Sequence, residues 1–226
     1  MILRFSNHET IILHPALAAC DPATRSVFVA DLHLGKTAAF HRAGIPMPEG
    51  SDADTLQRLS RLIAQTSAQN LVILGDVFHT RYAAMEPVLH RIAAWRAQHP
   101  AVRISIVPGN HDRCVPWSDW LPGAAILEAG TKLGAFRVMH HPALLEAEPV
   151  LCGHLHPGCA IGTRRMEKRT VPCFWLRDQT LVLPAFGAFT GLAKVRIGSV
   201  GKVFVPCGEK VIELTPAKVA PAPVKR

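Results

Sequence analysis

No apolar run in this sequence approaches the roughly 20 residues that a helix needs to cross a lipid bilayer. No positively charged segment followed by an apolar stretch opens the chain, so the pattern of a secretory leader is absent as well. We therefore expect a cytoplasmic protein that does not enter a membrane. The 226 residues show no internal repeat, and their number fits one large domain.

A disulfide framework is also missing. The cysteines form no Cys-x-x-Cys pair and no regular spacing; they are Cys20, Cys114, Cys152, Cys159, Cys173 and Cys207. Because 49% of the residues are hydrophobic and only 19% are charged, a chain of this length has enough apolar side chains for a core that needs no covalent staples. We expect reduced thiols.

Acidic residues are scarce relative to basic ones. Lysine and arginine together number 25, against 17 aspartates and glutamates, which gives a formal net charge of +8. Several of those carboxylates are assigned to cations below, so the outer surface is expected to be more basic than this sum. Residues 216–226 have the composition of a disordered basic tail, which leaves residues 1–215 for a single folded domain.

Five short clusters of Asp, Asn and His are present, and each follows a short aliphatic or β-branched run. The clusters are Asp31-Leu32-His33, Gly75-Asp76-Val77-Phe78-His79, Gly109-Asn110-His111-Asp112, His140-His141 and Gly153-His154-Leu155-His156. The runs before them are residues 26–30, 71–74, 103–107, 136–139 and 150–152. These runs are apolar enough to be strands covered on both faces, and open α/β sheets place ligand-binding groups where such strands end. One such cluster would be weak evidence, but five in this order predict a site.

The remaining pattern predicts an α/β fold. Residues 2–13 alternate like an edge hairpin. Apolar residues recur at helical spacing over 56–63, behind Ser51 and Asp52, which are expected to cap the helix start. A second helix is expected over 85–95, and the second half of the chain reads as shorter strands. Such a chain fits two mixed sheets packed face to face with helices outside, a four-layer αββα sandwich.

Taken together, the clusters resemble the calcineurin-like metallophosphoesterase superfamily, whose motifs read Asp-x-His, Gly-Asp, Gly-Asn-His-Asp, His and Gly-His-x-His along the chain. Further segments are similar to its bacterial ligase-associated DNA damage response endonuclease branch. These segments are residues 31–36, 44–48, 140–142, 153–157, 172–176 and 183–191. The resemblance covers residues 1–215 and implies the same four-layer metallo-dependent phosphatase fold.

The resemblance also implies a site for two divalent metal ions. Seven side chains serve as ligands in two groups that share one carboxylate. They are Asp31, His33 and His156 for one ion, Asn110, His140 and His154 for the other, and Asp76 as the bridge. Imidazole, carboxylate and amide ligands suit borderline divalent ions, so Mn²⁺ is our first expectation, with Fe or Zn as alternatives. Two such ions about 3.5–4 Å apart generate hydroxide at neutral pH and neutralise charge on the leaving oxygen.

Two features of the ligand set stay open at this level. His154 and His156 lie two residues apart, so both imidazoles would point the same way in an extended strand, whereas a turn would aim each at its own ion. His140 matches the position of the superfamily's ligand histidine, but the residue after it is usually small, and here it is His141. We assign His140 as the ligand and His141 as a substrate contact.

His111 and Asp112 are the predicted catalytic residues. The resemblance implies that the His111 imidazole faces the phosphate and protonates or stabilises the leaving oxygen, after attack by a metal-bound hydroxide. Asp112 is expected to orient that imidazole.

Basic side chains near the clusters are candidates for substrate contact. His79 and Arg81 follow the bridging aspartate, and Lys36, His41 and Arg42 follow the first cluster. A basic run also follows the last cluster, and it is either a rail for the phosphate backbone or a solvated face. This run consists of Arg164, Arg165, Lys168 and Arg169.

The expected function is a Mn²⁺-dependent phosphodiesterase that acts on DNA. The resemblance implies an endonuclease in DNA repair that works beside an ATP-dependent DNA ligase, a helicase and an exonuclease, and the net positive charge agrees with it. An alternative keeps the chemistry but takes a small cyclic or pyrophosphate-linked nucleotide. A third hypothesis, a non-catalytic scaffold, is disfavoured because no motif is lost. Exposed apolar edges would allow a homodimer.

Overall fold

The computed structural model describes residues 1–6, 8–80, 86–113, 115–142, 148–162, 167–196 and 201–215. Its helices are α1 (Lys36–Arg42), α2 (Ser51–Thr66), α3 (Glu86–Gln98) and α4 (Trp117–Trp120). Its strands are β1 (Ile2–Arg4), β2 (Thr10–His14), β3 (Ala18–Asp21), β4 (Ser26–Val29), β5 (Asn70–Leu74), β6 (Arg103–Val107), β7 (Ala125–Ile126), β8 (Thr131–Leu133), β9 (Phe136–Val138), β10 (Val150–Cys152), β11 (Pro157–Ile161), β12 (Arg169–Pro172), β13 (Phe174–Arg177), β14 (Thr180–Val182), β15 (Ala193–Val195), β16 (Lys202–Cys207) and β17 (Lys210–Leu214). The predicted contact residues Arg81, Arg164 and Arg165, and the predicted tail over 216–226, lie outside the described residues.

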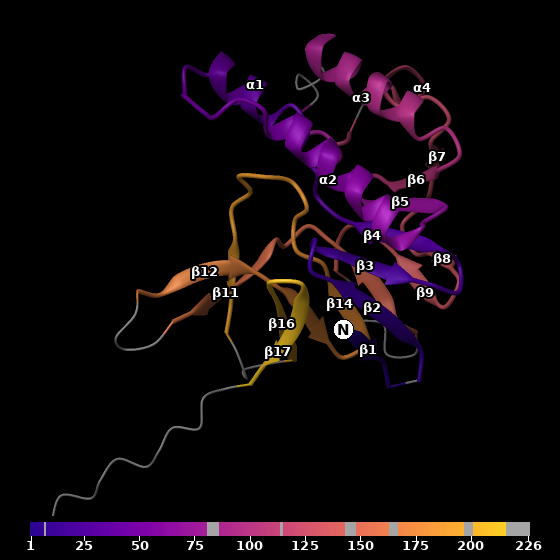
Figure 1. The fold of residues 1–226 in the computed structure, drawn as a ribbon, viewed down its shortest axis with the longest axis vertical. Coiled ribbons are helices and arrows are strands. Elements are labelled where there is room, and N and C mark those ends of the chain that lie inside the picture. The colour runs from indigo at the N-terminus through magenta and orange to yellow at the C-terminus, as the bar shows by residue number, and fades with distance from the viewer. Residues whose placement is uncertain are drawn as a thin grey trace, which may run out of the picture.

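Strands β1 to β7 form one mixed sheet in sequential order (Figure 1). Strands β1 to β4 pair antiparallel, and the predicted edge hairpin is confirmed, with Ile2 opposite Ile12. Strands β4 to β7 pair parallel, because helices carry the chain back between consecutive strands, as parallel pairing requires. The carboxyl ends of β4, β5 and β6 therefore meet at one edge of the sheet.

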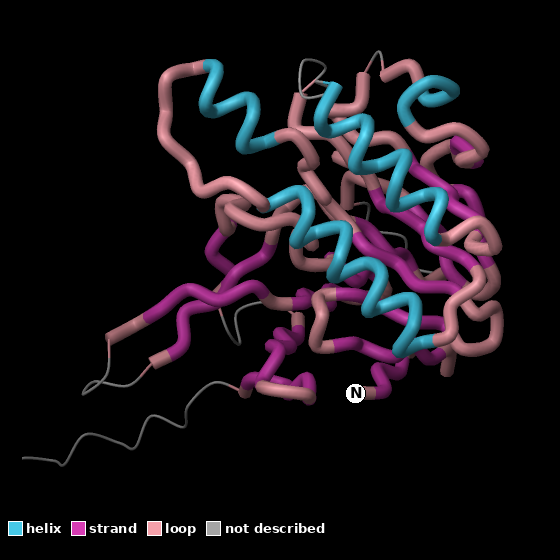
Figure 2. Tube along the Cα trace, turned by 45° about the horizontal axis from the view of Figure 1, so that its top comes forward, coloured by secondary structure: helices cyan, strands magenta, loops and turns pink. Residues whose placement is uncertain are grey.

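Alternation along these strands sorts the apolar side chains into two cores. Val27 and Val29 of β4 belong to a core with Leu59 of α2, and the helices gather on that side of the sheets (Figure 2). Phe28 lies between them in sequence and packs in the other core, where its ring meets that of Phe136 from the second sheet. Since successive side chains of a strand point to opposite faces, β4 is covered on both sides, as its apolar sequence predicts.

A second seven-stranded sheet, in the order β17-β16-β13-β14-β10-β9-β8, is also mixed. The predicted α/β fold of packed mixed sheets is confirmed. The fourth layer differs from the helical layer that we predicted, because within the described ranges no helix follows α4. Instead, a three-stranded sheet, β12-β11-β15, packs on the outer face of the second sheet through Cys159 and Val203. The described part of the second half consists of short strands, which supply a β layer rather than a helical one.

The predicted cap of helix α2 is wrong in its detail. The cap position is Gly50, in the left-handed conformation with φ 91°, and no side chain caps the helix start. Ser51 and Asp52 lie inside the first turn. The Asp52 carboxylate accepts the Gly35 N–H at 2.9 Å, and Ser51 Oγ lies 2.7 Å from Thr37 Oγ1. Ser51 and Asp52 thus bind the segment before α2 instead of capping the helix.

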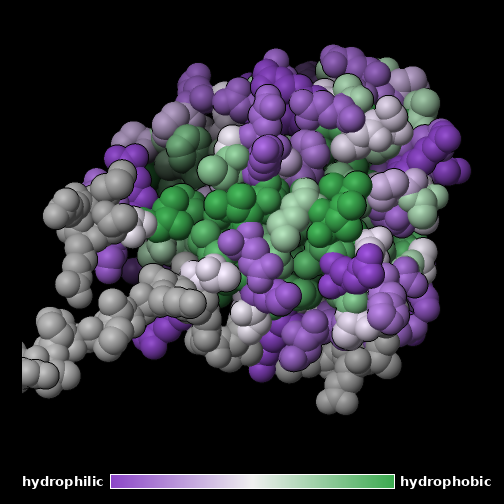
Figure 3. Space-filling model, turned by 60° about the horizontal axis from the view of Figure 1, so that its bottom comes forward, coloured by the Kyte–Doolittle hydropathy of each residue, from purple (hydrophilic) through white to green (hydrophobic). Residues whose placement is uncertain are grey.

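Several large apolar side chains are exposed in the described part of the chain. They are Met1, Ile2, Ile45, Ile126, Ile161, Phe189 and Ile212. Figure 3 presents a face on which apolar side chains gather in a band between polar borders. A homodimer through a surface of this kind stays a prediction. No helix in the described ranges combines the length and the apolar character that crossing a bilayer would require.

Candidate metal centre

Strand ends from both sheets converge on the predicted ligands. The clusters follow β4, β5 and β6 in the first sheet and β9 and β10 in the second. The loops after β4 and β5 are joined by backbone bonds, from Asp31 N–H to Gly75 O at 3.0 Å and from His33 N–H to Asp76 O at 2.9 Å. Among the residues that the structure describes, four groups of side chains have ligand atoms within 4.8 Å of one another. They are His140, His141 and His154; Asp31, His33 and His156; His33, Asp76 and His111; and Asp31, Asp76 and His140.

His33 and His156 form the first histidine pair. Their Nε2 atoms lie 3.2 Å apart, and His156 Nε2 is 3.5 Å from Asp31 Oδ1. The other ring nitrogen of His156 lies 3.2 Å from the Gly191 carbonyl oxygen. Because a carbonyl oxygen only accepts, Nδ1 of the neutral His156 ring carries the proton and Nε2 presents a lone pair. Gly191 therefore aims an electron pair of His156 at the centre.

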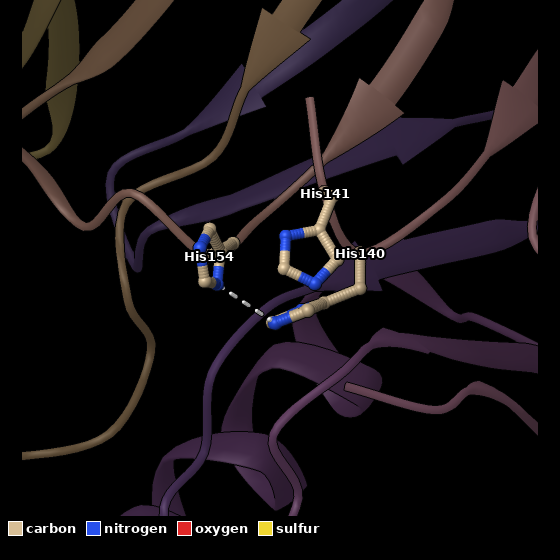
Figure 4. A group of neighbouring side chains, drawn as sticks. All are labelled: His140, His141 and His154. Carbon is tan, nitrogen blue, oxygen red and sulfur yellow. Dashed lines mark hydrogen bonds between the residues drawn. The ribbon is translucent and has the colours of Figure 1, made fainter. Parts of the chain in front are cut away.

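His140 and His154 form the second pair, from the loops after β9 and β10 (Figure 4). His140 Nε2 lies 3.1 Å from His154 Nδ1 and 3.0 Å from Asn110 Oδ1. His140 Nδ1 donates to the Leu74 carbonyl oxygen at 3.0 Å, which leaves Nε2 of the neutral ring as an acceptor. His140 is buried, whereas His141 is exposed and its ring centroid lies 4.1 Å from that of His154. The fold thus places His140 inside the centre and His141 on its solvent side.

Asp76 lies between the two pairs. Its buried carboxylate has Oδ2 4.0 Å from His33 Nε2 and Oδ1 3.5 Å from His140 Nε2. Oδ1 also accepts the backbone N–H of His111 at 2.9 Å. One carboxylate is therefore within 4.0 Å of an imidazole nitrogen of each pair, which is the place that a bridging ligand requires.

This donor set fits divalent cations. When His140 carries its proton on Nδ1 alone, Nε2 and Asn110 Oδ1 are two acceptors 3.0 Å apart, and a cation between them would satisfy both lone pairs. Metal–ligand bonds of about 2.0–2.2 Å put neighbouring ligand atoms about 3 Å apart. Burial lowers the pKa of His33 to about 2, with neighbouring histidines and Lys36 adding to the effect. The His33 imidazole is therefore neutral and free to bind a cation.

Left-handed backbone is concentrated at the predicted ligands. Side chains rarely tolerate this conformation, yet five of the seven adopt it. They are Asp31 (φ 55°), His33 (φ 48°), Asp76 (φ 49°), His154 (φ 71°) and His156 (φ 46°). The chain therefore turns at both His154 and His156, and their imidazoles join different groups, one with His140 and the other with His33.

Three glycines that precede predicted ligands are required by close packing. A Cβ on any of them would lie under 3.0 Å from an atom of a ligand side chain. The pairs are Gly75 with His140, Gly109 with Asp76, and Gly153 with Asp31. Residue-by-residue reasoning assigned these glycines no role. The sequence pattern that could have revealed them is a glycine directly before a polar residue, which occurs in three of the five clusters.

His111 lies on the open side of the centre. Its side chain is 37% exposed, and Nε2 is 3.9 Å from Asp76 Oδ2. Its ring stacks on that of His79, with centroids 5.7 Å apart and an interplanar angle of 15°. Burial lowers the pKa of His79 to about 4, helped by the charges of Lys36 and His111. His79 is thus a neutral surface that supports the exposed His111 ring.

Asp112 does not orient the His111 imidazole as predicted. Its buried carboxylate accepts backbone N–H groups of Gly109 at 2.9 Å, Phe78 at 3.2 Å and Val77 at 3.3 Å. Burial raises the pKa of this carboxyl. A buried carboxylate is held most effectively by several N–H donors, and here these donors come from two loops. Asp112 therefore positions the loops after β5 and β6 relative to each other.

Among the predicted substrate contacts, Lys36 is brought to the centre. Its ammonium donates to the Phe189 carbonyl oxygen at 2.7 Å, burial lowers its pKa, and its charge acts on His33 and His79. Arg42 lies exposed in the last turn of α1, outside the His and Asp groups described above.

The described part of the basic run is exposed. Lys168 and Arg169 are both on the surface, and Arg169 lies 3.8 Å from Glu167. They belong to the hairpin of β11 and β12, which extends away from the body of the molecule (Figure 1). Strand β11 begins directly after His156, so this hairpin starts at the metal centre.

Packed mixed sheets that bring two pairs of histidines to one buried carboxylate are the arrangement expected of a metal-dependent phosphoesterase. The family model for calcineurin-like phosphoesterases matches residues 24–150, more than half of the chain, and the chain belongs to this family. The predicted family is thereby confirmed.

The chain is also similar to solved structures. The crystal structure of the Pseudomonas putida nuclease MPE is 30% identical, covers 95% of this chain and 99% of its own, and has a TM-score of 0.80. The phosphoesterase Yfce from E. coli is 18% identical, covers 84% of this chain and 98% of its own, and has a TM-score of 0.44. No curated protein matches the chain. The likeness to the nuclease agrees with the predicted branch.

Proposed function

We propose that this phosphoesterase holds two divalent metal ions and hydrolyses phosphodiester bonds in DNA. The observation that carries the proposal is the two histidine pairs, with ring nitrogens 3.2 Å and 3.1 Å apart, and the Asp76 carboxylate within 4.0 Å of both. The net charge of +8 supports a polyanionic substrate. The likeness to a solved nuclease supports the same substrate class.

Residues of both groups would hold the ions. One ion would be held by Asp31, His33 and His156. The other would be held by Asn110, His140 and His154, and both would share Asp76. When bound, the ions lower the pKa of water and neutralise charge on the leaving oxygen. Mn²⁺ is the proposed metal, because the set mixes imidazole with carboxylate and amide oxygens.

The chain's own groups carry out the remaining steps. The Gly191 and Leu74 carbonyl oxygens hold the protons of His156 and His140 on their Nδ1 atoms, so that both Nε2 atoms face the ions. The His111 Nε2 atom, on the open side, delivers a proton to the leaving oxygen. Asp112 keeps the loop that carries His111 in place through backbone bonds.

A nuclease assay with matched small substrates tests this function. The metal-free chain would be loaded with Mn²⁺ and offered supercoiled plasmid, single-stranded DNA, bis-p-nitrophenyl phosphate and cyclic nucleotides. Cleavage of DNA and of the diester, abolished by a chelator, is expected. Turnover of cyclic nucleotides with intact DNA would replace the proposed substrate by a small nucleotide. Inertness toward every diester would refute a catalytic role.

His111→Ala is expected to separate metal binding from chemistry. Alanine keeps the backbone N–H that donates to Asp76, so two ions per chain should remain. Loss of the imidazole should lower kcat by about 10²–10⁴-fold, the usual contribution of a general acid. Elemental analysis and steady-state kinetics measure both quantities, with the exposed α3 variant His90→Ala as a control. Loss of both ions would contradict the assigned role.

Charge reversal of the basic run should weaken DNA binding. We expect glutamate at all four positions, Arg164, Arg165, Lys168 and Arg169, to raise the Kd for DNA and to flatten its dependence on salt, because fewer counterions are released. Fluorescence anisotropy over a salt series measures both. Reversal of Arg4, Arg61, Lys202 and Lys210 changes the net charge equally and serves as the control. If both variants raised the Kd equally, the effect would come from net charge alone, and the basic run would not be a specific contact for the phosphate backbone.

Work in DNA repair beside an ATP-dependent DNA ligase, a helicase and an exonuclease follows from the resemblance and stays a prediction. The cytoplasmic location stays a prediction as well.

A further inference from the structure

Phe189 is an aromatic side chain that the fold leaves 52% exposed. It lies between β14 and β15, and its backbone is left-handed, with φ 56°. A residue with a side chain rarely adopts that conformation, and an exposed ring forgoes the stabilisation of burial. Single exposed apolar residues are common, so the place of this ring in the molecule decides what it means.

The segment that carries Phe189 is fastened to the first ligand turn. Phe186 N–H donates to Ala30 O at 2.8 Å, and Gly187 N–H donates to Asp31 O at 3.0 Å. Both acceptors belong to the end of β4 and the ligand that follows it. The loop therefore cannot move away from the centre without breaking bonds to a predicted ligand.

The far end of the same segment touches a second ligand. The Gly191 carbonyl oxygen lies 3.2 Å from His156 Nδ1. Only Thr190 lies between Phe189 and Gly191, so the Cα atoms of these two residues are at most about 7 Å apart. The residue that carries the exposed ring is thus close in the chain to the carbonyl oxygen that contacts His156, which faces the proposed ions.

A cation binds the backbone of Phe189. Lys36 Nζ donates to the carbonyl oxygen of Phe189 at 2.7 Å and also lies 5.7 Å from the centroid of the Phe40 ring. An ammonium has three donors, so this backbone bond leaves two for another acceptor. Phe40 in turn lies 5.7 Å, between ring centroids, from His79, which supports His111. A chain of contacts therefore runs from the Phe189 carbonyl oxygen through Lys36 and Phe40 to His79.

We infer that Phe189 stacks on an unpaired nucleobase next to the scissile phosphodiester, while Lys36 contacts a neighbouring phosphate. Single-stranded nucleic acids are bound in this manner, by aromatic rings that receive bases and cations that follow the backbone. A base inside a duplex has both faces covered, so stacking on a side chain requires it to be unpaired. The inference rests on the proposed function and narrows its substrate to single-stranded or locally unpaired DNA.

The first test reads stacking without requiring cleavage. Single-stranded oligonucleotides with 2-aminopurine at successive positions would be titrated with the Mn²⁺-loaded chain. The wild type should quench the fluorescence at one position, Phe189→Tyr should do the same, and Phe189→Ala and Phe189→Leu should not. All of these variants keep a side chain on the left-handed residue, so their backbone strain is equal. Quenching that is absent in the wild type, or unchanged in Phe189→Ala, would overturn the inference.

The second test couples the ring to the base. An abasic site at the quenched position should lower kcat/KM of the wild type by about tenfold, the effect of losing one stacked base. Phe189→Ala should lose about tenfold on the intact strand and less than about twofold more on the abasic one. Equal discrimination by both proteins would refute stacking. Ile212→Ala, which truncates an exposed apolar residue of β17, should behave as the wild type.

These readouts separate the inference from the proposed function. If the wild type cleaves DNA and the substitutions of Phe189 change neither the quenching nor kcat/KM, only the stacking inference fails. If the wild type quenches 2-aminopurine through Phe189 but cleaves no DNA, the proposed hydrolysis fails and the nucleotide site stands.

Discussion

Asp76→Asn is expected to remove metal-dependent turnover, lowering kcat/KM by more than about 100-fold, since loss of an outer partner alone costs about 10–100-fold. Asparagine has nearly the same shape, and its amide oxygen still accepts the His111 N–H that Oδ1 binds at 2.9 Å. The substitution thus removes the charge and turns the Oδ2 position, which faces His33 and His111, from an acceptor into a donor. Metal content should fall below two ions per chain, because the carboxylate between the His33 and His140 groups no longer offsets the charges of both cations.

The stability of the metal-free form provides a sharper readout. Asp31 and Asp76 are both buried, and their carboxylates lie together with His140 within 4.8 Å. Without cations these like charges repel each other. Asp76→Asn should therefore leave the metal-free Tm unchanged or higher, while the rise in Tm on adding Mn²⁺ should shrink, because ligand binding stabilises only as far as it occurs.

A buried aspartate outside the centre supplies the control for Asp76. Asp21 ends β3, at the opposite end of the sheet from the clusters, and binds Ala23 N–H and Thr24 Oγ. Asp21→Asn should cost stability yet keep two ions and full turnover. Differential scanning fluorimetry with chelator and with Mn²⁺ would compare the two variants. Normal metal content and turnover in Asp76→Asn would remove this residue from the centre.

The location of the site could be predicted because the sequence shows where the strands end. The apolar runs that became β5 and β10 each stop at a glycine followed by a polar residue. Each strand pairs parallel with a neighbour whose end also carries a cluster, β4 for β5 and β9 for β10, and parallel strands bring such ends to one edge of their own sheet. Helix α2, which lies between β4 and β5 in the chain, could equally be predicted from the spacing of its apolar residues. These are local patterns, and the structure places their residues where the patterns require.

What the sequence could not reveal depends on contacts between distant segments. Asp112 neighbours His111 in sequence, so an orienting role was the natural reading, yet its carboxylate binds Val77 and Phe78, more than 30 residues away. The carbonyl that aims His156 belongs to Gly191, 35 residues downstream. Neither partner has a local signature, because any backbone N–H or C=O can fill the role.

Strain at the centre would couple folding to the binding of the proposed ions. Left-handed backbone costs an L-residue about 1–2 kcal/mol, and His33 and His156 both adopt it while facing each other. The cost is tolerated because surrounding bonds fix these turns, and bound cations would offset it further. The same crowding explains the glycines, since a turn that brings a ligand against neighbouring backbone leaves no room for a Cβ.

Gly75→Ala should disable the second histidine pair. Gly75 has φ 82°, and a Cβ there would lie under 3.0 Å from His140 Nδ1 and Cγ. The ring would have to move, breaking its bond to the Leu74 carbonyl oxygen and its approach to Asn110 and His154. We expect loss of about one ion per chain and a fall in kcat/KM of more than about 100-fold, as for a displaced ligand.

Gly123→Ala separates this clash from backbone strain. Gly123 has φ 78°, almost the angle of Gly75, but a Cβ there would meet nothing within 4 Å. Both variants pay the same left-handed penalty of about 1–2 kcal/mol, and only Gly75→Ala also displaces a ligand. Gly123→Ala should therefore lower Tm while metal content and kcat/KM stay at wild-type values. If the two variants lost ions equally, or if Gly75→Ala kept both, the His140 ring would not be the ligand that this close approach serves.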